Sequence, residues 1–257
     1  MKKNKSNFRI DIIIIFFILL LGPATGLLLS KTNLLDKIEF LNILRPKVDV
    51  YEPIALNYKD EIIFSSTKTS DLESFLNQIS LNYKNISNLE KLPNFSLLSL
   101  PKDLSNVEPT SRRKEIFLSS ILPLVVKSNL DILNDRKILC EAIKNKDNKI
   151  KEEIAKKHYI DLSKIEKLMI DNTLIRKIDI VPISLVMAQA AAESGWGTSR
   201  FALEGNALFG QWTWDKSKGI QPKFGSDQKA AVRKFETLSD SVNSYLSNLN
   251  THIAYSS

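Results

Sequence analysis

The sequence predicts a mainly α-helical domain with a small β-hairpin lobe, preceded by an apolar N-terminal helix. Apolar residues recur at helical spacing through most of residues 111–192 and again through 239–253. Segments 210–214 and 231–235 look like strands, and the sequence between them contains glycine and proline, which favours a hairpin with a long loop. Residues 12–29 are apolar or small throughout.

This N-terminal segment is expected to be an export signal that remains as a membrane anchor. The apolar run from Ile12 to Leu29 is about long enough to cross a bilayer as a helix. The basic residues between Lys2 and Arg9 predict a cytoplasmic N-terminus and an exported remainder, which would be periplasmic. Gly22–Gly26 also resembles a cleavage region, so secretion after signal cleavage is the alternative. The protein is expected to contact the membrane through this N-terminal segment.

Residues 31–110 are interpreted as a spacer and irregular wrap between the anchor at 1–30 and a catalytic domain at 111–257. Prolines recur through this stretch, and each tends to end a regular element. One short helix is expected from Asp71 to Ile79, with its apolar residues on one face.

Helical periodicity dominates from Ser111 to about residue 180. Pro123 lies inside the first helical pattern and predicts a kink or two shorter helices. Further helices are expected at Asp131–Ala142, Lys151–Tyr159 and Leu162–Leu174.

Charge and composition argue against nucleic-acid binding and metal chemistry. The formal charge is +7, but four of these charges precede the first acidic residue, which leaves 7 − 4 = +3 for the remaining chain. That charge is too small and too dispersed for a nucleic-acid surface. Cys140 is the single cysteine, so no internal disulfide forms, and its helical pattern predicts a buried position. His158 and His252 are not at metal-ligand spacing. No cofactor is expected.

The most informative residue is Glu193, at the end of an alanine-rich segment. Pro182 suits a first helical turn, and Ile183–Ala192 predicts a buried helix that the following glycines terminate. A carboxylate at a helix C-terminus, in an apolar neighbourhood, should have a raised pKa, which suits a general acid. The alternative is a solvent-facing glutamate at a frayed helix end.

Aromatic residues follow Glu193 closely. A cleft wall that binds sugars through ring faces and an amide would suit them, and a small local core is the alternative. The residues are Phe201, Asn206, Phe209, Trp212 and Trp214. Tyr245 lies on the apolar face of the last helix, either as a core residue with a polar tip or as a site hydroxyl.

These residues also carry a family resemblance. The segments AQAAAESGWGTSRFALEGNALFGQW and VRKFETLSDSVNSYLSNLNTHIAY closely resemble the glucosaminidase domain of bacterial cell-wall hydrolases, especially the Bax-type proteins. The resemblance extends more loosely back to Ser111. It implies a lysozyme-like helical lobe and a small β lobe across a cleft, cleavage of the β-1,4 bond after N-acetylglucosamine, and peptidoglycan glycan strands as the partner. It also implies further helical sequence after residue 257, so that the domain is C-terminally truncated.

The resemblance places the acid on Glu193 and assigns sugar or water positioning to Tyr245. The substrate-binding positions that it implies are Trp196, Asn206, Phe209 and Trp212.

A second carboxylate is not evident from the motifs. Asp215 and Asp227 are the β-lobe candidates, whereas Glu204 and Glu236 are interpreted as surface residues. The acetamido group of the substrate is the other possible nucleophile. A lytic transglycosylase and a non-catalytic wall-binding module are the alternative functions.

Overall fold

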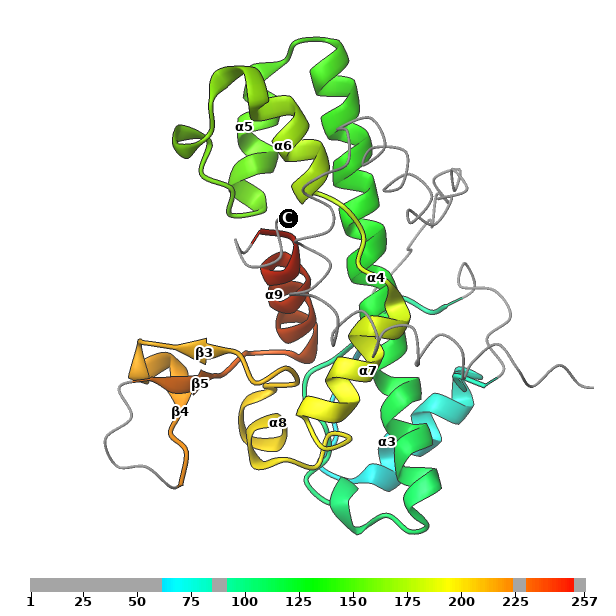
Figure 1. Cartoon of the computed structure of the whole chain (residues 1–257). Helices are drawn as coiled ribbons and strands as arrows, with labels where there is room; N and C mark the ends of the chain where they lie inside the picture. The colour runs from blue at the N-terminus through cyan, green and yellow to red at the C-terminus, as the bar shows by residue number, and fades with distance from the viewer. Residues whose placement is uncertain (1–61, 85–91, 224–229, 252–257) are drawn as a thin grey trace, which may run out of the picture. The chain divides into compact units, whose positions relative to one another are not determined.

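The computed structural model describes residues 62–84, 92–223 and 230–251, and within them the mainly helical prediction is confirmed (Figure 1). The helices are α3 (Thr69–Gln78), α4 (Thr110–Lys144), α5 (Asn148–Lys157), α6 (Ile170–Lys177), α7 (Ile183–Glu193), α8 (Arg200–Gly205) and α9 (Leu238–Thr251). The strands are β1 (Ile62–Phe64), β2 (Phe95–Leu97), β3 (Trp212–Thr213), β4 (Gly219–Ile220) and β5 (Ala231–Arg233). The apolar segment 12–29, Asp227 and His252 lie outside the described residues.

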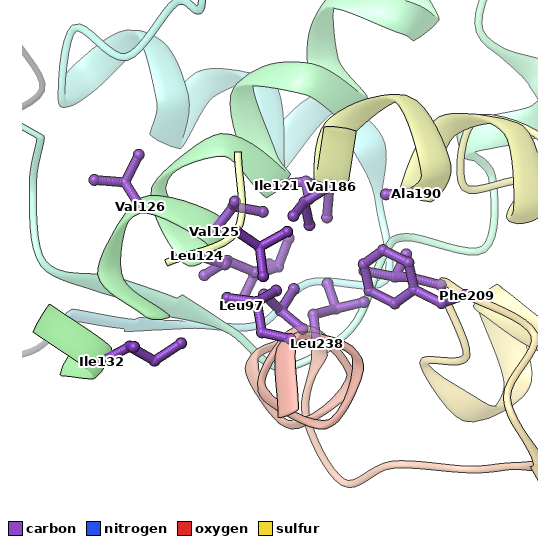
Figure 2. Close-up of a cluster of buried hydrophobic side chains, with 14 of the residues drawn as sticks. Leu97, Ile121, Leu124, Val125, Val126, Ile132, Val186, Ala190, Phe209 and Leu238 are labelled. Atoms are coloured by element: carbon purple, nitrogen blue, oxygen red, sulfur yellow. The ribbon is translucent and has the colours of Figure 1, made fainter. Parts of the chain in front are cut away.

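The long helix α4 is the centre of the core, and α5, α7 and α9 all pack against it. Its buried apolar side chains meet Val186 and Ala190 of α7 and Leu238 of α9 in one cluster (Figure 2). Pro123 is a buried residue of this helix. The helix is continuous, although two shorter helices were one of the two expectations. Packing on several sides explains why the missing N–H of Pro123 does not end the helix.

Helix α4 is also long and apolar enough to cross a membrane, by length and composition. However, 67% of its most apolar window is buried inside the protein. A helix in the centre of a folded core has the same composition, because its neighbours replace water on most sides. We therefore interpret α4 as a core helix.

Residues 62–109, where described, contribute part of the same core. Strands β1 and β2 pair in parallel, with Ile62 opposite Phe95. The predicted short helix at 71–79 is observed as α3, and its Leu72 and Leu76 are buried. On α3, Phe75 stacks on Phe64 with ring centroids 4.3 Å apart. The interpretation of this region as a spacer separate from the catalytic domain stays a prediction.

An ion cluster joins α4 to the C-terminal end of α5. Asp147 caps α5 by accepting a hydrogen bond from the backbone N–H of Ile150. At the other end of α5, the buried Asp135 of α4 accepts from Lys157 Nζ at 2.7 Å and lies 2.9 Å from His158 Nε2. Cys140, five residues beyond Asp135 on α4, is exposed, so its predicted burial is wrong. The apolar pattern of α4 leaves Cys140 on the solvent side.

The small β lobe is a three-stranded antiparallel sheet in the order β3-β5-β4. The two predicted strands pair as expected, with Trp212 opposite Val232. The additional strand β4 pairs with the other edge of β5. Gly219 allows this pairing, because a Cβ there would lie 2.5 Å from the Cβ of Ala231.

The ion cluster predicts a pH-dependent stability. Burial alone would raise the pKa of Asp135, but the hydrogen bonds from His158 and Lys157 outweigh it and lower the pKa below its usual 3.8. A lowered native pKa stabilises the fold above the unfolded pKa, and that contribution is lost as the pH falls through the native value. Asp135→Asn should cost ~3 kcal/mol at neutral pH, the lower end for a broken buried pair, because Lys157 is 60% exposed.

Urea denaturation of wild type and Asp135→Asn as a function of pH measures this difference. We expect it to be constant at mildly acidic pH and to shrink as the pH falls below about 4. A difference that stays unchanged on further acidification would contradict the assignment.

Candidate functional site

The end of α7 is held by a turn built around Ser194. This residue is fully buried, and its hydroxyl donates to the carbonyl of Ala190 at 2.5 Å and accepts from the N–H of Gly197 at 2.8 Å. The N–H of Trp196 returns to the carbonyl of Ala191 at 2.8 Å. Gly195, Trp196 and Gly197 all have positive φ, from 59° to 77°. Such a run reverses the chain sharply and leaves Glu193 as the last helical residue.

Glu193 lies at the helix C-terminus, as predicted, but it is exposed. The predicted burial of the whole of α7 is wrong, because only one side contacts the core. Its buried residues are Val186, Ala190 and Ala191. Leu185, Ala188 and Ala192 lie on an exposed side that leads to Glu193. Alanine suits both close helix packing and an open surface, so composition could not separate the two.

Glu193 lies beside the segment that connects α8 to β3. A Cβ built on Gly210 would be 3.7 Å from Glu193 Oε2, so the carboxylate lies against this glycine. Gly210 has a φ of 58°. The preceding residue, Phe209, is buried and stacks face to face on Tyr245 of α9, with centroids 4.0 Å apart and an interplanar angle of 1°. The adjacent residues Phe209 and Gly210 therefore connect Tyr245 with Glu193, and we call these four residues the Glu193 group.

Tyr245 and Phe209 both have a packing role. Tyr245 is half-buried and packs against the core, which agrees with the prediction of a core residue on the apolar face of α9. The predicted site residues did not include Gly210, although this glycine follows Leu208 and Phe209 in the segment that carries the family resemblance.

Trp196 and Asn206 have structural contacts that the sequence did not reveal. The Trp196 ring meets the edge of Phe117 with centroids 6.1 Å apart, and Lys114 Nζ lies 4.5 Å from its centroid. Asn206 is buried in a left-handed conformation at the end of α8. Its Nδ2 donates to the carbonyls of Phe235 and Glu236. A sugar contact by either residue stays a prediction.

The tryptophans of the β lobe are open to solvent. Trp212 on β3 is 59% exposed and Trp214 is 81% exposed. Exposed indole rings are costly in water and suit flat apolar partners such as sugar faces. Phe201 is half-buried on α8, with the guanidinium of Arg200 4.8 Å from its ring centroid.

Among the acidic candidates, Asp215 is occupied by local contacts. Its Oδ1 accepts from the hydroxyl and the N–H of Ser217, and its Oδ2 lies 3.4 Å from Lys218 Nζ. These hydrogen bonds, led by the Ser217 hydroxyl, lower the pKa of Asp215 below its usual value. Glu204, which lies on α8, and Glu236 are exposed, as predicted for surface residues. Within the described residues, no group of three or more His, Cys, Asp and Glu side chains can hold a metal ion.

The Ser194 turn predicts that Gly197 cannot be replaced. A Cβ at this position would lie 2.6 Å from Leu100 Cδ1 and 2.8 Å from Phe117 Cδ2, both in buried residues, and φ is 77°. Overpacking and left-handed strain together should make Gly197→Ala ~3 kcal/mol less stable.

Gly195→Ala is the matched control in the same turn. It has a φ of 59°, and its nearest non-neighbour contact would be Thr198 Oγ1 at 3.6 Å. This control should therefore lose only about 1 kcal/mol, from strain alone. Equal losses for the two variants in urea denaturation would show that Gly197 is not tightly packed.

The C-terminal part of the chain is similar to known proteins. Residues 172–257 match the Glucosaminidase family, described as mannosyl-glycoprotein endo-beta-N-acetylglucosaminidase. The chain is 34% identical over 170 residues to Protein bax of Escherichia coli (strain K12), across 62% of this chain. The chain spans 58% of the length of that relative. No solved structure matches. The two matches support a glucosaminidase domain at residues 172–257, in a chain that is similar to Protein bax.

Proposed function

We propose that the chain is a peptidoglycan hydrolase that cleaves the β-1,4 bond following N-acetylglucosamine, with Glu193 as the general acid. The observation that carries the proposal is the position of Glu193. It ends α7, is open to solvent, and lies against Gly210 in the group that contains Tyr245. The glucosaminidase match covers this group completely, and its family supports a glycosidase activity on a glycan.

Each neighbour of Glu193 has a role in this proposal. Gly210 presents no side chain, so a sugar can approach the carboxylate closely. The Phe209–Tyr245 stack fixes the direction of the tyrosine, which positions the sugar or the attacking water. The exposed ring of Trp212 stacks on a sugar face.

Besides the general acid, the reaction needs a nucleophile or a base. The candidates for this second group are Asp215, Asp227 and the acetamido group of the substrate. The local contacts of Asp215 argue against it, because moving its carboxylate to the substrate would break the cap that it forms with Ser217. Substrate assistance needs no protein nucleophile and uses a group that N-acetylglucosamine already carries. We therefore favour substrate assistance.

We also propose that the apolar segment 12–29 tethers the domain to the plasma membrane and places it on the periplasmic side. The basic residues that precede this segment and its length support the proposal. Cleavage at Gly22–Gly26 would instead release the domain.

The proposal predicts that Glu193→Gln loses most of the hydrolase activity and keeps the fold. Glutamine has nearly the same shape but cannot donate the proton, so the rate should fall about 10²–10⁴-fold. Release of soluble fragments from purified peptidoglycan measures the rate. Glu204→Gln is the matched control, because this exposed glutamate pairs with Arg200 at 3.2 Å and such pairs contribute little.

The products of the same digest separate the alternative functions. Mass spectrometry should detect fragments that end in reducing N-acetylglucosamine. Fragments that end in 1,6-anhydro sugars would identify a lytic transglycosylase. Binding to peptidoglycan without any product would identify a non-catalytic module.

A further prediction concerns the space beside the carboxylate. Gly210→Ala places a methyl group 3.7 Å from Glu193 Oε2, where the sugar should approach, and kcat/KM should fall about tenfold. Gly195→Ala imposes similar strain, since φ is 59°, but its methyl group would lie 3.6 Å from Thr198 Oγ1 rather than beside Glu193. If both variants lose the same activity, strain rather than the occupied space explains the loss.

A further inference from the structure

A polar cavity of about 950 Å³ lies beside the Glu193 group and is not part of it. Its walls are α4, the C-terminal end of α5, β5 with the segment that follows it, and α9. Figure 1 shows α9 between the α5–α6 pair and the small sheet. The volume is typical of sites that bind small ligands.

The cavity is adjacent to the proposed site along two segments of chain. Gln211 lines the cavity, and the preceding Gly210 lies against Glu193. Ser244 also lines the cavity, and the next residue is Tyr245. Gln211 Nε2 donates to the carbonyl of Ser244 at 3.4 Å, which ties the two segments together. A branched molecule with a sugar beside Glu193 can therefore extend a side branch into the cavity.

The lining presents an acceptor without a donor. Gln211 Oε1 is buried and accepts no hydrogen bond within the described part of the chain. A buried acceptor that stays unsatisfied costs about 1–3 kcal/mol, so a turn of the Gln211 amide toward a ligand N–H in the cavity would offset that cost.

The lining also presents unneutralised charge. Arg233 is exposed, with its guanidinium 5.0 Å from the Phe235 ring centroid and Nη1 3.4 Å from Ser244 Oγ. No carboxylate lies within ion-pair distance of Arg233 or of the neighbouring Lys234 among residues 62–84, 92–223 and 230–251. The carboxylates of Asp131, Asp135, Glu236 and Asp240 also line the cavity, and Asp135 is paired with Lys157. Neighbouring cations and carboxylates suit a ligand that carries both charges.

We propose that this cavity binds the stem peptide that branches from the glycan strand, with Arg233 holding a peptide carboxylate and Gln211 accepting a peptide N–H. The proposal rests on the proposed function, because peptidoglycan is the polymer in which such a peptide is attached to the sugar. An uncharged sugar would not use a guanidinium that lacks a carboxylate partner, whereas a peptide carboxylate would.

Hydrolysis kinetics on two substrates test the proposal, namely intact peptidoglycan and glycan strands stripped of peptide by an amidase. Arg233→Gln should raise KM about tenfold on intact peptidoglycan, with kcat unchanged, because a charge-assisted hydrogen bond is lost. KM on stripped strands should not change. Arg233→Lys should restore part of the loss. Lys216→Gln, an exposed cation of the same lobe outside the cavity, should have no effect.

A binding measurement separates this proposal from the proposed function. Calorimetry with the free stem peptide and the full chain in detergent should detect binding that Arg233→Gln weakens about tenfold. Peptide binding without any hydrolysis would support the cavity and overturn the hydrolase. The opposite result is hydrolysis of both substrates without peptide binding, with equal effects of Arg233→Gln on each substrate. It would overturn the proposed peptide binding in the cavity and support the hydrolase activity.

Discussion

The hydroxyl of Ser194 holds the turn on which the site depends. It bonds to the last turn of α7 through Ala190 and to the N–H of Gly197, and it is completely buried while doing so. Gly197 in turn packs so closely on Leu100 and Phe117 that no side chain fits. The end of α7 is thereby fixed to α4 and to the segment that precedes it. Glu193 has a defined position although it is itself exposed, because the residue after it is fixed in the core.

A second set of hydrogen bonds attaches α9, which carries Tyr245, to the segment between α8 and β3. The N–H of Leu208 donates to Ser241 Oγ at 3.2 Å, and Asn206 donates to carbonyls that directly precede α9. The segment between α8 and β3 is therefore attached to α9 at several points. A Cβ on its Gly210 would lie 3.7 Å from Glu193 Oε2, and its Phe209 stacks on Tyr245. This connecting segment joins two residues that are far apart in the sequence, and it also forms the boundary with the polar cavity.

The sequence predicted features that depend on local patterns, and it failed where packing between distant elements decides. Helical spacing located α3, and the glycines after Glu193 located the end of α7. The strand-like segments on either side of a loop with glycine and proline located β3 and β5. Pro123 was expected to kink a helix or to divide it into two, and surrounding contacts keep α4 continuous. The exposed side of α7, the solvent-facing Cys140 and the structural use of Asn206 depend on neighbours that periodicity cannot identify. Asp135 carries no motif, and its partners lie on another helix.

The central claim is that Glu193 donates its proton to a glycosidic oxygen. The most direct measurement is a crystal structure of an inactivated Glu193→Gln variant soaked with a peptidoglycan fragment that spans the scissile bond. We expect the amide of residue 193 to lie within hydrogen-bonding distance of the bridging oxygen, with the sugar against Gly210 and close to Tyr245. A fragment bound elsewhere, with residue 193 in contact only with water, would contradict the account.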